Sequence, residues 1–248
     1  MSNYQNIIGM GSTDSLTIRR IQELLILFGF VGLAVDGIYG KITKTIVKAY
    51  QSTHFDASGK PLKVDGLVGP LTYGSFYYNL NKKNPITPPL LIEVLKIARQ
   101  EVGVKEEPVG SNYGPRVNEY LKCVGLGPGY SWCMAFVYFV FDKASAKLNR
   151  VNPLVKTAAC MHQWDKSNGK KITSAEAIAN PKLIEPGSIF IIRKKGGRGH
   201  TGIVTAVQKD YICTIEGNAN AFHSSDGDGV VEQIRPINSI TAGFIIHC

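Results

Sequence analysis

The 248-residue sequence lacks several patterns that would place it in a class directly. No segment approaches the roughly 20 apolar residues that span a bilayer, so we expect no membrane insertion. The first residues form neither a basic segment nor an apolar core, so we expect no secretory signal and synthesis in the cytoplasm. The five cysteines are odd in number and contain no Cys-x-x-Cys pair, which argues against a disulfide framework or a structural zinc site.

Acidic residues are scarce relative to basic ones, and the net charge is +9. A surplus of this size favours polyanionic partners, either nucleic acid or an anionic cell-wall polymer. The basic clusters are short, and aromatic residues do not alternate with them as they do in RNA-binding sheets. They are Lys82-Lys83, Lys170-Lys171 and Arg193-Lys194-Lys195. We therefore expect no nucleic-acid partner.

The spacing of histidines and acidic residues predicts no metal site. No His-x-x-x-His pair occurs, and residues 226–229 (Asp-Gly-Asp-Gly) lack the further acidic ligands of an EF-hand loop. We expect no metal and no cofactor.

An internal repeat marks the first part of the chain. Residues 35–43 and 64–72 both read Val-Asp-Gly-x-x-Gly-x-x-Thr. Asp-Gly favours a tight turn, and the second glycine suits a left-handed position before a helix. Apolar residues at helical spacing over 16–28 and 43–50 predict helices around these loops. Residues 1–80 are therefore predicted to form a small three-helix bundle.

The prolines of residues 85–89 preclude a continuous helix. Residues 81–89 are predicted to be a short, stiff linker, which makes residues 90–248 a second domain. In that domain the pattern predicts helices over 90–100 and 116–123 and a third that begins near Cys133. Strands are predicted over 187–193, 199–207 and 211–216, so the class is α+β with an antiparallel sheet.

Ser131-Trp132-Cys133 directly precedes the unbroken apolar run 134–141. Gly-Pro-Gly at 127–129 ends any earlier helix, and Ser131 is the expected N-cap. Cys133 would then lie in the first turn of a buried helix, where the helix dipole favours the nucleophilic thiolate. The alternative is a buried structural cysteine, because cysteine is among the most buried residue types.

A nucleophilic cysteine needs a base and a group that orients the base. His200 is the one histidine at the start of a predicted strand between glycines, which suits a general base. Glu216 and Asn218, two residues apart on the next strand, are expected to share a face with it. That arrangement needs an even index sum between the strands, so we predict an odd-length loop or a bulge between Val207 and Ile212.

The motifs in the two parts of the chain resemble those of two different protein families. The doubled Val-Asp-Gly loop, with Ile21-Gln22 before it and residues 47–51 between its copies, resembles the peptidoglycan-binding type 1 domain over about residues 12–80. Trp132-Cys133, residues 199–202 (Gly-His-Thr-Gly) and residues 216–218 (Glu-Gly-Asn) resemble the CHAP domain, the cysteine, histidine-dependent amidohydrolase/peptidase family, over about residues 90–248. The first resemblance implies binding to bacterial peptidoglycan, and the second implies a papain-like fold.

The CHAP resemblance also implies roles for particular residues. Cys133 would be the nucleophile, His200 the base, Glu216 the orienting acid and Asn218 a supporting polar residue. We also expect Trp132, Asn112 and Tyr113 to contact substrate. Some members of the CHAP family bind calcium, so calcium binding stays an alternative.

The function predicted from these resemblances is hydrolysis of an amide bond in peptidoglycan by a monomer. The bond would be the one that an N-acetylmuramoyl-L-alanine amidase cleaves or a peptide cross-link that an endopeptidase cleaves. The enzyme would act on the cell wall as a phage lysin released by lysis or as a secreted antibacterial effector. The alternative is a catalytically inactive wall-binding adaptor.

Overall fold

The computed structural model describes residues 6–28, 30, 32–81, 88–220 and 227–247. The chain divides into two compact units, Met1–Pro85 and Ile86–Cys248. Most of the linker predicted over 81–89 lies outside the described residues. No helix among the described residues has the length and apolar character needed to cross a membrane.

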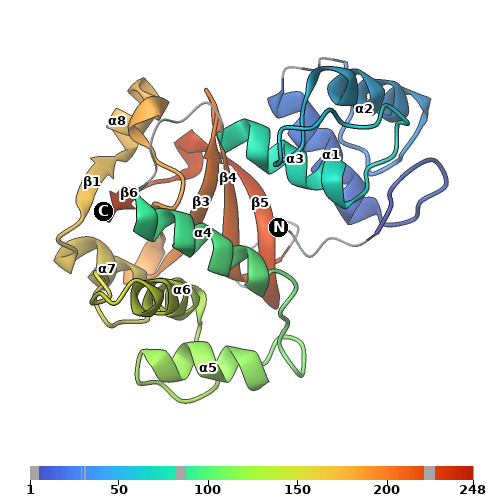
Figure 1. Cartoon of the computed structure of the whole chain (residues 1–248). Helices are drawn as coiled ribbons and strands as arrows, with labels where there is room; N and C mark the ends of the chain where they lie inside the picture. The colour runs from blue at the N-terminus through green and yellow to red at the C-terminus, as the bar shows by residue number, and fades with distance from the viewer. Residues whose placement is uncertain (1–5, 29, 31, 82–87, 221–226, 248) are drawn as a thin grey trace. The chain divides into compact units, whose positions relative to one another are not determined.

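The first unit contains three helices, α1 (Ser15–Leu27), α2 (Lys41–Thr53) and α3 (Pro70–Asn81) (Figure 1). Asp14 begins α1, because its side chain accepts a hydrogen bond from the backbone N–H of Thr17 at 3.0 Å. Apolar side chains from all three helices are buried, among them Ile18, Ile21, Leu24, Val47, Tyr50 and Phe76. The predicted helical bundle is therefore confirmed.

A buried glutamine fastens each repeated loop to the helix that precedes it. In the first copy, Nε2 of Gln22 on α1 donates to Oδ1 of Asp36 at 2.8 Å. Its Oε1 accepts the backbone N–H of Gly37 at 2.9 Å. Gly37 has a φ of 76°, a left-handed conformation that glycine adopts without strain. One amide thus pairs both with the carboxylate and with the backbone of the turn.

The second copy repeats this arrangement on α2. Nε2 of Gln51 lies 3.1 Å from Oδ1 of Asp65, and its Oε1 accepts the N–H of Gly66 at 2.8 Å. The two copies also contact each other, because the Tyr39 hydroxyl donates to the carbonyl of Gly66 at 3.0 Å. The sequence repeat is therefore a structural repeat, built on a helix-to-loop clamp.

The second unit is built on a six-stranded antiparallel sheet of order β1-β6-β2-β3-β4-β5 (Figure 1). Its strands are β1 (Lys170–Thr173), β2 (Ile189–Arg193), β3 (Gly199–Val207), β4 (Tyr211–Ala219), β5 (Gly229–Pro236) and β6 (Gly243–Ile246). The predicted strands β2, β3 and β4 are present, whereas β1, β5 and β6 were not predicted.

The described part of the second unit also contains helices, most of which contact this sheet (Figure 1). They are α4 (Pro89–Glu101), α5 (Pro115–Cys123), α6 (Cys133–Lys147), α7 (Cys160–Lys166) and α8 (Ser174–Ala179). The buried α6 lies against β3 and β4, and α4 and α5 pack on α6. The α+β class with an antiparallel sheet is confirmed, whereas α7 and α8 were not predicted.

The hairpin between β3 and β4 has its irregularity in a different place from the one predicted. The turn itself is a regular two-residue turn, in which the N–H of Gln208 donates to the carbonyl of Tyr211 at 2.8 Å. The register instead shifts between Val204 and Ala206, inside β3. The prediction of an irregularity between Val207 and Ile212 is therefore wrong, because the extra residue is accommodated as a bulge within the strand.

The bulge nevertheless produces the register that the site needs. Beyond it, Ile203 pairs with Ile215, which has the even index sum expected. Continuation of this register sets Gly202 opposite Glu216. A Cβ atom at Gly202 would lie 2.7 Å from Cγ of Glu216, so the absence of a side chain there leaves room for the carboxylate.

Replacement of Gln22 by leucine should destabilise the first unit. The substitution removes the acceptor of the buried Gly37 N–H, a loss that costs about 1–3 kcal/mol. It also removes a donor to the exposed carboxylate of Asp36. Calorimetry of the full chain should show a lower unfolding temperature, and hydrogen exchange should show faster exchange of the Gly37 amide.

Thr45→Ala on the exposed face of α2 serves as the control, with stability expected within about 0.5 kcal/mol of the parent. If Gln22→Leu unfolds at the temperature of this control, the glutamine clamp does not stabilise the loop.

Candidate active site

Cys133 is the first residue of α6, as predicted, but Ser131 does not cap the helix. The N-cap is Trp132, with φ −119° and ψ 13°, and no side chain caps the backbone there. The first backbone N–H groups of α6 have no partner within the helix and therefore point towards the Cys133 end. Ser131 is exposed and lies one residue too early to accept them.

Trp132 has a different role from the one expected. Its indole is 0 % exposed, and its Nε1 donates to Oε1 of Glu106 at 2.8 Å. A buried ring offers no surface to a substrate, so its placement contradicts the expectation of substrate contact. The indole packs instead on β4, where a Cβ atom at Gly217 would lie 2.7 Å from both Trp132 and Phe136. This glycine allows the first turn of α6 to touch the strand.

The Cys133 thiol is 5 % exposed and has several polar neighbours. Its Sγ lies 3.6 Å from Sγ of Cys160, the first residue of α7. The hydrogen bond with Cys160 lowers the pKa of Cys133, burial opposes this effect, and the adjacent His200 and the N–H of Met134 lower the pKa further. The net direction is downward, so the thiolate is favoured, which is the nucleophilic form.

His200 lies on β3 with its ring completely buried. Its Nε2 lies 2.7 Å from Oε2 of Glu216, and its Nδ1 has no hydrogen-bond partner among the described residues. Burial alone would lower the pKa of His200, but Cys133 and Glu216 outweigh it and raise the pKa to about 9. The imidazolium form is thus stabilised between a carboxylate and a thiolate, and Nδ1 is the nitrogen left to exchange a proton.

Glu216 is a fully buried carboxylate with donors on both oxygens. Arg235 of β5 donates from Nε to Oε1 at 2.5 Å and from the guanidinium to Oε2 at 2.6 Å. Thr214 donates its hydroxyl to Oε1 at 2.6 Å. Burial would raise the pKa of Glu216, but the hydrogen bonds from Arg235 and His200 lower it to about 2. The carboxylate therefore stays charged at any ordinary pH.

Asn218 does not share the surroundings of Glu216. The register of β4 with β5 shifts between Glu216 and Ala219, and Asn218 has a φ of 53°. This break in the strand directs its amide to the Asn112 side chain, 3.0 Å away. After a half-turn of the amide, its Oδ1 accepts the backbone N–H of Trp132, also at 3.0 Å. Asn218 thus supports the start of α6 and makes no hydrogen bond with His200 among the described contacts.

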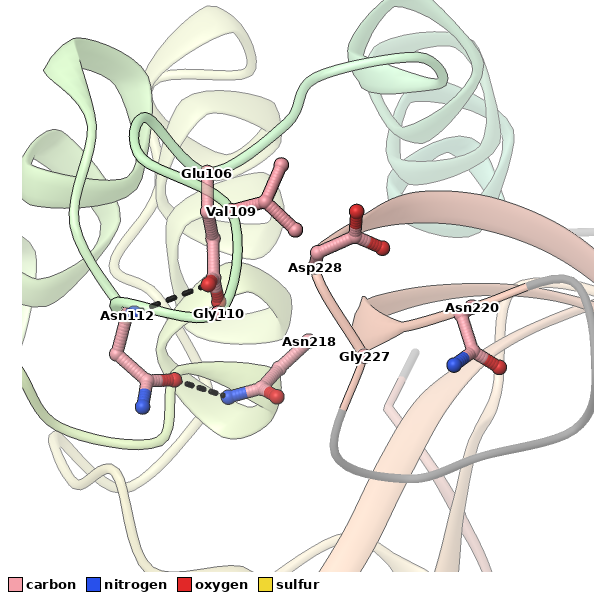
Figure 2. Close-up of a pocket in the computed structure, with 8 residues that line it drawn as sticks. All are labelled: Glu106, Val109, Gly110, Asn112, Asn218, Asn220, Gly227 and Asp228. Carbon is pink, nitrogen blue, oxygen red and sulfur yellow. Dashed lines mark hydrogen bonds between the residues drawn. The ribbon is translucent and has the colours of Figure 1, made fainter.

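A cavity of about 460 Å³ opens beside Asn218 (Figure 2). Its lining consists of Glu106, Val109, Gly110, Asn112, Asn218, Asn220, Gly227 and Asp228. The Asn112 N–H donates to Oε2 of Glu106 at 3.0 Å, which holds this loop in place. The side chain of Tyr113 is 46 % exposed and is not part of the lining.

Comparison with known families agrees with these features. The family described as "CHAP domain" matches residues 125–218, and the family described as "Putative peptidoglycan binding domain" matches residues 15–75. The chain carries a CHAP domain preceded by a peptidoglycan-binding type 1 domain. The resemblance predicted from the sequence is confirmed.

No curated protein matched the sequence. A solved structure, described as an X-ray crystal structure of PlyC, matched at 14% identity with a TM-score of 0.39. The match covers 98% of this chain and 53% of the PlyC chain, so this chain spans about half the length of that one.

The CHAP domain contains polar residues that the sequence did not identify. Cys160 contacts the Cys133 thiol, Arg235 holds Glu216, and Glu106 anchors Trp132. Cys160 and Glu106 carry no sequence signal that distinguishes them. Arg235 ends the mixed polar and apolar segment 230–235, and only the sheet register identifies its partner.

Metal ligands do not gather in the part of the chain that the structure describes, where no group of three His, Cys, Asp or Glu side chains is placed to hold an ion. Of the residues considered for calcium, Asp226 lies outside the described residues, and Asp228 lines the cavity.

The stability of the CHAP domain should depend on pH through Glu216 and His200. The pKa of Glu216 falls from 4.5 to about 2 on folding, so its contribution is present above pH 4.5 and is lost as the pH falls towards 2. The pKa of His200 rises from 6.5 to about 9, so its contribution is present below pH 6.5 and is lost as the pH rises through 9. Denaturant unfolding should show the greatest stabilisation from this pair between pH 4.5 and pH 6.5, where both contributions are present. A Glu216→Gln variant with the same pH profile as the parent would contradict the assignment.

Removal of Arg235 should destabilise the CHAP domain strongly. Arg235→Met breaks the buried ion pair of Glu216 with its guanidinium partner, which typically costs about 3–5 kcal/mol. Denaturant unfolding measures the loss, and Arg235→Lys should recover part of it because the charge remains without the paired donors. Arg198→Met, at an exposed arginine, is the control. Equal stabilities of the two methionine variants would exclude a structural role for Arg235.

Proposed function

We propose that this chain is a cysteine-dependent hydrolase that cleaves an amide bond of peptidoglycan. One observation carries the proposal: a buried thiol with a lowered pKa, an imidazole and a carboxylate meet at the first turn of a helix in a CHAP domain. This arrangement is the generalised form of a nucleophile, a base and an orienting group.

In the proposed reaction, the Cys133 thiolate attacks the carbonyl carbon of the scissile amide. His200 protonates the leaving amine, which releases the first product and leaves a thioester on Cys133. His200 then accepts a proton from water, which hydrolyses the thioester and regenerates the thiolate. Glu216 keeps the ring of His200 oriented and stabilises its charged form.

The oxyanion formed during attack also needs donors. The backbone N–H of Cys133, at the first position of α6, has no partner within the helix. We assign it as an oxyanion donor, because a fixed dipole costs no reorganisation when the charge develops. Trp132 positions this backbone, since Glu106 holds its indole and Gly217 admits it against β4.

The cavity beside Trp132 is the proposed site for one side of the polymer. Asn112 and Asn218 offer amide groups at its wall, which suit the peptide and amide groups of peptidoglycan. Tyr113, exposed on the same loop, would extend this contact surface.

Residues 1–80 are proposed to hold the enzyme on its insoluble substrate, with 81–89 as the spacer to the hydrolase of 90–248. Tethering raises the effective concentration of the enzyme at its substrate. The net charge of +9 also favours adhesion to anionic wall polymers. A phage lysin and a secreted antibacterial effector both fit this design.

Cys133→Ala should abolish digestion of purified sacculi, with a rate at least about a thousandfold below the parent, because no other group replaces the nucleophile. The decrease in turbidity of a sacculus suspension measures the rate. Cys123→Ala, at a half-buried thiol on α5, is the control and should keep the parent rate. The Cys133→Ala protein should still sediment with sacculi. Digestion at the parent rate by Cys133→Ala would exclude the proposed nucleophile and favour the inactive adaptor.

Mass spectrometry of the parent digest identifies the bond. Free glycan with intact stem peptides indicates an N-acetylmuramoyl-L-alanine amidase. Cleaved cross-links with peptides still attached to glycan indicate an endopeptidase.

A further inference from the structure

A buried thiol beside the proposed nucleophile has no role in the proposed reaction. Cys160 is almost fully buried, and its sulfur lies 3.6 Å from that of Cys133. Both are free thiols. A second thiol in contact with the reactive one has the arrangement of a redox-sensing pair, in which one sulfur is oxidised and its neighbour resolves the product.

The fold holds the two sulfurs in this position. Cys133 begins α6 and Cys160 begins α7, and α7 packs against β2 and β3. On the strand side, Gly199 directly precedes His200 and leaves room for Cys160, since a Cβ atom there would lie 2.8 Å from that of Cys160. The sulfurs need to approach by roughly 1.5 Å to form a covalent bond.

The two thiols differ in pKa and therefore in reactivity towards an oxidant. The proton that the two sulfurs share lowers the pKa of Cys133 and raises that of Cys160. The thiolate reacts with peroxides, whereas the thiol does not. As a residue, Cys133 is 5 % exposed, and hydrogen peroxide is a small molecule. Oxidation therefore begins at Cys133.

We propose that Cys133 and Cys160 form a reversible disulfide that switches the hydrolase off under peroxide oxidation, an inference that rests on the proposed role of Cys133 as nucleophile. The oxidant is hydrogen peroxide. The Cys133 thiolate attacks one of its oxygens, so that the S–O bond forms and the O–O bond breaks. The second oxygen leaves as hydroxide, which is protonated to water. The sulfur loses two electrons and the peroxide gains them.

The sulfur of Cys160 then attacks that of Cys133. The S–S bond forms, the S–O bond breaks, and the hydroxide leaves as water with the proton of Cys160. A dithiol reductant returns both thiols by exchange. Formation of the disulfide removes the nucleophile. It also protects Cys133 from oxidation to the irreversible sulfinic and sulfonic acids.

The test uses the reduced full chain, the C160S variant and C123S as the matched control. C160S keeps a hydroxyl that can donate to Cys133, so it separates loss of the disulfide from loss of a hydrogen bond. Each protein is treated with hydrogen peroxide and then with dithiothreitol. Sacculus digestion is measured at each stage, and peptides are mapped by mass spectrometry after alkylation.

In the parent and in C123S, peroxide should reduce activity more than about tenfold, a Cys133–Cys160 linked peptide should appear, and dithiothreitol should restore activity. In C160S, peroxide should inactivate the enzyme without recovery, with Cys133 found as sulfinic or sulfonic acid. Absence of the linked peptide from the inactivated parent, or equal recovery of C160S and parent, would overturn the inference.

The two readouts separate this inference from the proposed function. A linked peptide in a parent that never digests sacculi would support the thiol pair and overturn the hydrolase. Digestion by a parent that forms no linked peptide would support the hydrolase and overturn the thiol pair.

Discussion

The buried carboxylate of Glu216 is the charge on which the CHAP domain depends. A carboxylate in such surroundings costs several kcal/mol unless donors satisfy it. Arg235, Thr214 and His200 satisfy both of its oxygens. Because these donors come from β3, β4 and β5, the ion pair forms only when the three strands are in register. The same interactions that keep the site charged therefore also hold the sheet together.

Groups of opposite charge follow one another from the Glu216 carboxylate through the His200 imidazolium to the Cys133 thiolate. Glu216 stabilises the imidazolium of His200, which in turn favours the Cys133 thiolate. The start of α6 contributes backbone N–H groups to the same sulfur, and Cys160 contributes a proton. The reactivity of Cys133 therefore follows from the packing of helices on a sheet.

Local features of the sequence were enough to predict much of the architecture. The apolar run after Cys133 predicted α6, and the Val-Asp-Gly repeats predicted the loops of the helical bundle, because helices and turns depend on nearby residues. The elements between residues 160 and 179 were not predicted, since short elements such as α7, β1 and α8 are stabilised by tertiary contacts. The hairpin register was anticipated, but the bulge lies within β3, where packing decides which residue is left unpaired.

The sequence by itself determined the chemistry of the site: a cysteine before an apolar helix, a histidine at a strand start and an acid on the next strand. Only the tertiary structure decided the partners of these groups. Arg235 reaches Glu216 across a strand pairing, and Cys160 reaches Cys133 because α7 packs beside α6 and β3. Such contacts join residues far apart in the chain, and their energy comes from burial of polar groups. Burial exists only after the sheet and the helices have assembled.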